Sequence, residues 1–122
     1  MKQVLFVGMG GFAGAIARYG VNLIVARFWF GEFPLATLLI NVSGSFVLGF
    51  FSTYATSSSA LDPAWRLFLA TGFIGAYTTF STFQYETHRL VATGGTSWAI
   101  LNVLLSLVAG FAAVRMGVWL AE

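Results

Sequence analysis

The sequence predicts an all-α membrane protein with four transmembrane helices, and three observations lead to this fold class. Hydrophobic residues make up 58% of the 122 residues and charged residues 8%, whereas about 25% charged residues is usual in soluble domains. Long runs carry no charge at all, including residues 33–61, 67–85 and 90–114. The tryptophans fall at or near the ends of the apolar segments, where indole rings favour the membrane interface: Trp29, Trp65, Trp98 and Trp119.

The boundaries of the helices follow from the charges and the turn-forming residues. A helix needs about 20 mostly apolar residues to cross a bilayer, and backbone in lipid must satisfy its own hydrogen bonds. We expect a single transmembrane domain over residues 1–122, with helices at about 4–26, 34–55, 66–87 and 97–119. The short connections hold turn formers: Pro34, Ser57–Ser59, Asp62–Pro63 and Gly94–Gly95. The apolar start after Lys2 is interpreted as an uncleaved first span rather than a secretory signal.

Composition also excludes several classes of function. The net charge of +2 rests on six scattered basic residues, so no basic cluster predicts nucleic-acid binding. The chain has no cysteine, which removes disulfides and thiol chemistry. An intramembrane enzyme would need a nucleophile beside a base, or paired metal ligands. Ser81 has no histidine within its apolar run, and the chain holds one histidine, His88, so we expect a protein that is not an enzyme.

The basic residues give almost no bias in membrane orientation. With four spans, three lie on one side and two or three on the other: Lys2, Arg66 and Arg115 against Arg27, Arg89 and, where it reaches the surface, Arg18. The positive-inside rule therefore selects no clear orientation. Either small numbers fluctuate, or copies insert both ways round and pair antiparallel. Four helices also offer too little perimeter to enclose a polar path, which separately favours an oligomer.

Glycines in the first segment follow a helix-packing pattern. The run from Gly8 to Gly14 superficially matches the G-x-G-x-x-A turn of dinucleotide-binding proteins, with Glu32 near the spacing of a ribose-binding acid. That motif has meaning only inside a βαβ unit, and no such unit follows. Gly10 and Gly14 instead form a small-xxx-small face on which another helix can approach closely.

Polar residues recur every four positions in two of the segments, which places them on one face of each helix. The second segment carries Thr37, Asn41, Ser45 and Gly49, and the last carries Asn102, Ser106 and Gly110. Such stripes serve either as interhelical hydrogen bonds or as the lining of a polar pathway. The stripes alone leave both interpretations open.

The stretch from Gly72 to Phe83 is the strongest functional candidate. It places two glycines and four hydroxyl residues near the middle of an apolar segment, and glycine and threonine both weaken a helix. Unwinding there frees carbonyls, which suit a cation, and N–H groups, which suit an anion. Phe80 and Phe83 lie on nearly one face, and aromatic ring edges are positive. The pair therefore fits either a small-anion path or ordinary packing.

Taken together, these residues resemble the bacterial fluoride channel family, also called the CrcB or Fluc family. The resemblance covers the whole chain and rests on three motifs, of which the last is very specific: Gly10-Gly-Phe-Ala-Gly14-Ala-Ile-Ala-Arg18-Tyr, Ala36-Thr-Leu-Leu-Ile-Asn41-Val-Ser-Gly44-Ser-Phe-Val-Leu-Gly49 and Gly72-Phe-Ile-Gly75-Ala-Tyr-Thr78-Thr-Phe80-Ser-Thr-Phe83. It implies an antiparallel, dual-topology homodimer with two fluoride pores. It also implies a third helix that is broken near its middle.

The resemblance further implies roles for single residues. Backbone carbonyls of Gly75 and Thr78 from both subunits would hold a structural Na⁺ on the dimer axis, while Phe80 and Phe83 would present ring edges to fluoride. Asn41 would line the pore, and the polar region around it would comprise Ser81, Thr82, Thr37 and Ser106.

Two charged residues and one departure complete the comparison with this family. Arg18 matches a basic residue near the aqueous vestibule, where it would raise the local anion concentration. Glu86 matches an acidic residue at the far end of the third helix, to which no role is assigned. Asn102 stands where we expected a hydroxyl or aromatic residue, which leaves the pore lining on the last helix less defined.

The function implied by the resemblance is passive, fluoride-selective export from the cytoplasm, across a bacterial inner membrane that the chain crosses several times. Its partners would be fluoride, the identical subunit and the lipid bilayer. The alternative is a small proton-coupled multidrug-type exporter, which needs a titratable group within the membrane. The four acids sit at or beyond the predicted helix ends, which disfavours that alternative: Glu32, Asp62, Glu86 and Glu122. A purely structural membrane subunit would leave the stretch from Gly72 to Phe83 unexplained.

Overall fold

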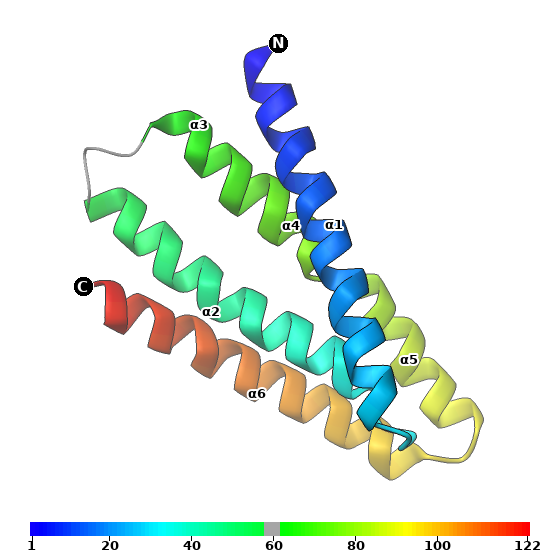
Figure 1. The fold of residues 1–122 in the computed structure, drawn as a ribbon. Coiled ribbons are helices and arrows are strands. Elements are labelled where there is room, and N and C mark those ends of the chain that lie inside the picture. The colour runs from blue at the N-terminus through cyan, green and yellow to red at the C-terminus, as the bar shows by residue number, and fades with distance from the viewer. Residues whose placement is uncertain (58–61) are drawn as a thin grey trace.

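The computed structural model describes residues 1–57 and 62–122, and every regular element in these two ranges is helical. The chain is ordered as α1 (Lys2–Phe28), α2 (Leu35–Ser57), α3 (Pro63–Arg66), η1 (Leu67–Ile74), α4 (Gly75–Tyr77), α5 (Phe80–Ala92) and α6 (Thr96–Ala121). Figure 1 shows these elements as an elongated arrangement of long helices without a sheet. The all-helical prediction is therefore confirmed for the described residues.

Three helices, α1, α2 and α6, are long and apolar enough to cross a membrane. Their bounds lie within a few residues of the first, second and fourth predicted helices. Ser58 and Ser59 of the predicted second connection lie outside the described residues.

The third predicted helix, residues 66–87, differs from a single long helix. The chain is helical from Pro63 through η1, a wider π-helical stretch, to Tyr77, and helical again from Phe80 to Ala92. The second of these two pieces is α5, which has 13 residues. The segment extends beyond its predicted bounds because Asp62 caps its start, with Oδ1 accepting from the Ala64 N–H at 2.8 Å, and because helical geometry persists until the turn at Gly94, where φ is +86°.

Glycines allow α1 to lie directly against η1. A Cβ on Gly10 would come within 2.9 Å of the Phe73 nitrogen and would overlap the Phe68 carbonyl, while one on Gly14 would overlap the Phe73 carbonyl. From the other side, a Cβ on Gly72 would lie 2.6 Å from the Val7 carbonyl oxygen. The small-xxx-small prediction for Gly10 and Gly14 is confirmed, and their partner is the backbone of η1.

A second pair of helices, α2 and α6, runs side by side along most of its length (Figure 1). A Cβ on Gly49 would overlap the Val114 carbonyl, and one on Gly117 would lie 2.7 Å from the Phe50 nitrogen. Gly49, predicted as an extension of the polar stripe, is thus a packing position. The molecule consists of two tightly packed helix pairs, and the interruption at residues 78–79 lies between α4 and α5.

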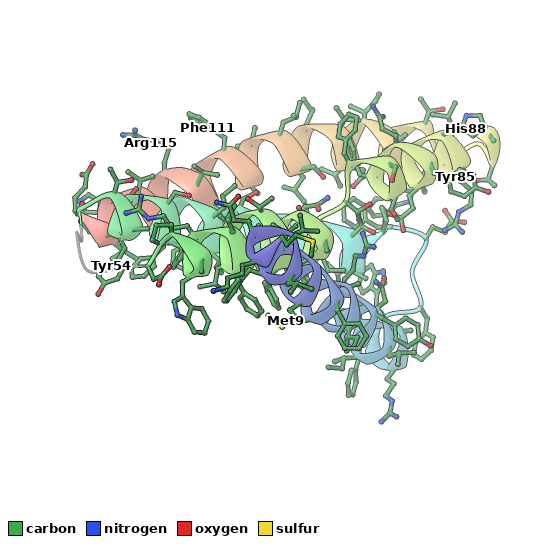
Figure 2. All side chains as sticks on the ribbon, turned by 90° about the horizontal axis from the view of Figure 1, so that it is seen from above. Met9, Tyr54, Tyr85, His88, Phe111 and Arg115 are labelled. Atoms are coloured by element: carbon green, nitrogen blue, oxygen red, sulfur yellow. The ribbon has the colours of Figure 1, made fainter. Side chains whose placement is uncertain are left out.

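Large apolar side chains cover much of the outer surface. Met9 on α1 and Phe111 on α6 point away from the helices in opposite directions, as Figure 2 shows, and both are exposed. His88 and Arg115 lie toward opposite ends of the molecule in the same view. This surface suits contact with lipid or with a second apolar surface.

Candidate functional site

The backbone leaves helical geometry at two consecutive threonines between α4 and α5. Thr78 has φ −76° and ψ 157°, and Thr79 has φ −151° and ψ 114°. β-Branched residues fit such extended backbone better than they fit a helix. The Thr78 N–H still donates to the Ile74 carbonyl at 3.0 Å, but the helical ladder is interrupted from Thr79 on, whose peptide groups need other partners.

Asn41 of α2 supplies those partners for Thr79. The Thr79 N–H donates to Asn41 Oδ1 at 2.8 Å, and Asn41 Nδ2 donates to the Thr79 carbonyl at 3.0 Å. In an unbroken helix the Thr79 N–H would instead bond to the Gly75 carbonyl. The Asn41 contact therefore stabilises the extended residue and removes a donor from Gly75.

The Thr79 side chain caps the start of α5. Its Oγ1 accepts from the Thr82 N–H at 3.3 Å, donates to Thr82 Oγ1 at 2.9 Å and lies 3.5 Å from Ser81 Oγ. The first four N–H groups of a helix have no acceptor within that helix. With Thr82 capped, the N–H groups of Phe80 and Ser81 are left for an external acceptor. This end of α5 also carries the positive end of the helix dipole.

The two candidate phenylalanines stand together at this helix start. Their ring centroids are 5.9 Å apart with an interplanar angle of 42°. Phe80 is 71% exposed, whereas Phe83 is 8% exposed. The Phe83 ring is therefore held by packing within this chain, and the Phe80 ring projects from it.

A pocket of about 230 Å³ opens beside the interruption. Its walls come from α2, η1 and the interruption itself: Asn41, Gly44, Ser45, Leu48, Ile74, Thr78, Thr79 and Phe80. The structure thus brings together candidate residues from the second and third predicted helices. Two residues of the α2 stripe, Asn41 and Ser45, therefore face the weakened part of the third segment.

Arg18 reaches the interruption from α1. One guanidinium nitrogen lies 3.5 Å from the Thr78 carbonyl oxygen, and Asn22 Nδ2 donates to the Arg18 carbonyl at 2.9 Å. Arg18 thus lies against the end of α4, beside one of the two predicted sodium ligands. Gly75, the other, is exposed.

The remaining candidates are divided between this site and a second cluster. Ser81 and Thr82 lie on the exposed first turn of α5, next to the interruption. Thr37 and Ser106 do not line the 230 Å³ pocket. Thr37 is 3% exposed, and Ser106 Oγ lies 3.5 Å from Asn102 Oδ1. Thr37 and Ser106 therefore lie apart from the polar group at the interruption.

Glu86 corrects a sequence-based interpretation. It was placed at or beyond a helix end, but α5 continues to Ala92, so Glu86 lies within a helix and beside Thr37. Its Oε2 atom is buried and has no hydrogen-bond partner among the described residues. The placement of Glu86 at or beyond a helix end is therefore wrong. Its cause is the predicted helix end at residue 87, which was too early.

Sequence reasoning missed some of the polar contacts. Thr79 was counted only among the hydroxyl residues, although its backbone and side chain organise the interruption. The Ser43 and Tyr77 hydroxyls lie 2.9 Å apart across α2 and α4, and neither residue had been selected as a candidate. The adjacent threonines within an apolar segment were the available signal for Thr79. No local pattern marks the contact between Ser43 and Tyr77.

The fold and the site define a small polytopic helical membrane protein with an interrupted helix at a polar pocket. The sequence matches the family described as CrcB-like protein, Camphor Resistance (CrcB), over residues 5–118, and the chain belongs to this family. A relative from Chlorobaculum tepidum is 49% identical over 100% of this chain and 96% of its own length. Relatives from Prosthecochloris aestuarii and Chlorobium chlorochromatii are 45% and 43% identical, over 99% and 98% of this chain and 94% and 95% of their own lengths. All three are named fluoride-specific ion channel FluC.

Proposed function

We propose that this protein is a fluoride-selective passive channel that exports fluoride from the bacterial cytoplasm across the inner membrane. The observation that carries the proposal is the start of α5, where Thr79 caps the helix and the Phe80 and Phe83 rings lie 5.9 Å apart. Full-length relatives named as fluoride-specific channels support the same conclusion. Fluoride is the most compact halide, and this site offers small, fixed donors at a helix terminus.

The chemistry of the site suits a strongly hydrated anion. Conduction requires groups that replace the water around the ion without holding it too tightly. The free N–H groups of Phe80 and Ser81, the Ser81 and Thr82 hydroxyls and the positive ring edges supply such groups. None carries a full positive charge, so the anion can leave. The negative-inside membrane potential then drives fluoride outward.

The polar path would continue from this helix start along Asn41, Thr37 and Ser106. Thr37 and Ser106 lie on α2 and α6, the two long helices that pack side by side. Arg18 would raise the anion concentration at the mouth of the path. In this arrangement the Asn41 carboxamide both lines the path and holds Thr79 by its two hydrogen bonds.

We propose that two copies pair antiparallel, with dual topology, and form two pores. Phe80 is 71% exposed in the single chain, and a ring that faces lipid could not select an anion. A second subunit would cover this ring and complete the pore wall. The nearly even distribution of basic residues between the two sides fits insertion in both orientations.

We also propose a structural Na⁺ held by the Gly75 and Thr78 carbonyls of both subunits. The donor set fits this ion, because both oxygens lie at the end of α4, where the helix dipole is negative. The Gly75 carbonyl has lost its usual donor to Asn41, and the Thr78 carbonyl has only the 3.5 Å contact with Arg18 that the structure records. Sodium would there offset the partial negative charges of carbonyl oxygens that face each other across the proposed dimer.

Flux from liposomes tests the proposed function. Purified protein in vesicles loaded with fluoride or chloride should release fluoride passively and retain chloride. Phe80→Ile and Phe83→Ile should each lower fluoride efflux by about tenfold or more, equivalent to about 1.4 kcal/mol in the barrier. Phe111→Ile is the matched control, because Phe111 is equally exposed, at 70%, but lies on α6. Equal release of both anions, or no fluoride release, would contradict a fluoride channel.

One observation favours a second candidate, the proton-coupled exporter. The Oε2 atom of the half-buried Glu86 is buried without a hydrogen-bond partner among the described residues. Proton coupling needs such a group within the membrane. The same vesicles with an imposed pH gradient distinguish the two functions. A channel releases fluoride without the gradient, whereas an exporter takes up a cationic dye only with it.

A further inference from the structure

Helix α5, which carries both phenylalanine rings, depends mainly on α6 for its position. α6 is the principal neighbour of α5, and α2 is a minor one. Asn102 of α6 donates a side-chain hydrogen bond to Thr87 of α5. At the start of α5, the Asn41 side chain of α2 holds the capping residue Thr79. The position of α5 therefore rests on these two contacts together with apolar packing.

The contact between Asn102 and Thr87 belongs to a directed chain of hydrogen bonds that ends at Phe83. Asn102 Nδ2 donates to Thr87 Oγ1 at 2.9 Å, and Thr87 Oγ1 donates to the Phe83 carbonyl at 2.7 Å. At the other end, Ser106 Oγ donates to Asn102 Oδ1 at 3.5 Å. A hydroxyl has one hydrogen, and that of Thr87 is used at the Phe83 carbonyl. Thr87 must therefore accept from Asn102, which determines the orientation of the carboxamide.

Because these hydrogen bonds are buried, they restrict how α5 can lie against α6. Asn102 is 1% exposed and is one of the two largest fully buried side chains. A buried amide without partners is unfavourable, so Asn102 stays where both its oxygen and its nitrogen are paired. A rotation or shift of α5 along α6 would break the contact with Thr87. Asn102 thereby selects one register between the two helices.

We propose that Asn102 is a positioning residue for Phe83: through Thr87 it holds the first turns of α5 so that the buried ring keeps its place beside Phe80. The proposal rests on the proposed function, since it assigns Phe83 to the anion path. It differs from ordinary stabilisation because the hydrogen bonds determine where the Phe83 backbone lies. Apolar packing of equal strength would leave that position less defined.

Variants of Thr87 and Asn102 test this role through selectivity. Thr87→Val keeps the shape of the side chain and removes the hydroxyl, while Thr87→Ser keeps the hydroxyl. We expect Thr87→Val and Asn102→Leu each to lower the ratio of fluoride to chloride efflux by about tenfold, equivalent to about 1.4 kcal/mol in relative barriers. Thr87→Ser should retain the ratio of the unmodified protein. The double variant Thr87→Val with Asn102→Leu should be no worse than either single one, because both break the same chain.

Leu90→Ala controls for general loss of stability. Leu90 is buried on the same helix, so its truncation weakens the packing of α5 without touching the hydrogen bonds. This variant should melt at a lower temperature and keep its selectivity. If Thr87→Val also melts lower but keeps its selectivity, or if its effect adds to that of Asn102→Leu, the positioning role is wrong. Thr87→Val removes no buried volume, so it keeps the test valid where Asn102→Leu does not fold.

A readout without flux separates this proposal from the proposed function. NMR of protein carrying an isotope-labelled ring at Phe83 reports the environment and flipping rate of that ring. Thr87→Val should shift and broaden this signal, and Thr87→Ser should leave it unchanged. An unmodified protein that releases no fluoride would contradict the channel, while the ring signal would still report on the hydrogen-bond chain. An identical ring signal in Thr87→Val would overturn the positioning role.

Discussion

The side-chain amide of Asn41 pairs with both backbone polar groups of Thr79, accepting from its N–H at 2.8 Å and donating to its carbonyl at 3.0 Å. The carboxamide thus replaces the neighbouring strand that an extended residue would have in a sheet. Non-helical backbone at membrane depth persists only where protein or a polar cavity satisfies it. The polar stripe of α2 and the interruption of the third segment are therefore one feature rather than two.

Asn41→Leu should destabilise the protein and weaken fluoride efflux together. The substitution leaves the Thr79 N–H and carbonyl without partners, which costs about 1–3 kcal/mol for each unsatisfied group. Since Thr79 caps α5, loss of its geometry also misplaces the helix start that binds the anion. The measurements are thermal unfolding in detergent and fluoride efflux from liposomes.

The control for Asn41→Leu lies one half-turn away on the same helix. Ser43→Ala removes a hydrogen bond to Tyr77 that is exposed to solvent, and it should change both measurements little. Asn41→Asp adds a second test, because an ionised carboxylate cannot donate to the Thr79 carbonyl. If Asn41→Asp behaved like the unmodified protein, the donor half of the pair would have no importance.

Much of the site could be predicted because its residues report on local backbone preference. Threonine weakens a helix wherever it occurs, which marks Thr78 and Thr79. The spacing of Phe80 and Phe83 places them on nearly one face. The partner of Thr79 could not be predicted from its own segment, since Asn41 is 38 residues away. The four-residue stripe suggested that Asn41 faces something polar, but it left pathway and packing open. In the structure Asn41 pairs with the backbone of Thr79 and also lines the pocket beside it.

The fold could be predicted for a similar reason, and its prediction failed at the end of α5. Lipid-exposed helices need only length and apolarity, so α1, α2 and α6 were expected close to where they lie. The end of α5 was misplaced because polar residues such as Thr87 and Glu86 resemble an interface when they are considered alone. Thr87 lies instead against α6, where it accepts a hydrogen bond from Asn102.

Gly14→Ala should disrupt the packing of α1 on η1, whereas Gly20→Ala should be tolerated. A Cβ at Gly14 would lie 2.9 Å from the Phe73 carbonyl carbon, and one at Gly20 would meet nothing within 4 Å. Overpacking against rigid backbone costs about 1–3 kcal/mol. Gly20→Ala removes backbone freedom from the unfolded chain and should stabilise the helix by about 0.5–1 kcal/mol. Thermal unfolding of both variants shows the difference, and equal loss in both would mean that close approach is not what Gly14 provides.

Removal of sodium should weaken the proposed dimer. Replacing Na⁺ by N-methylglucamine at constant ionic strength leaves the carbonyls of Gly75 and Thr78 without a small cation. A ligand present at 100 times its Kd contributes about 2.7 kcal/mol to the stability of the state that binds it. We expect a lower melting temperature and a larger monomer fraction in detergent, both restored by added Na⁺. Equal melting curves and equal monomer fractions in the two salts would remove the structural sodium from the proposal.

Glu86→Gln separates the channel from the proton-coupled exporter at the residue where the two differ most. The substitution keeps the size of the side chain and removes its charge, so no proton can be exchanged at this position. An exporter that uses this buried carboxyl would lose pH-driven uptake entirely. A passive channel should retain fluoride-selective efflux, because the proposed path uses N–H groups, hydroxyls and ring edges.

The stability of Glu86→Gln gives an independent measurement. Burial of a carboxylate oxygen without a partner is unfavourable if the group is charged, and an amide in the same place lowers that cost. The melting temperature of the variant should therefore be at least that of the unmodified protein. Glu86→Ala is the matched comparison, because it removes the packing against Thr37 as well as the charge, and it should melt lower. A melting temperature for Glu86→Gln as low as that of Glu86→Ala would show that the carboxylate itself stabilises α5, through a donor brought by a second subunit.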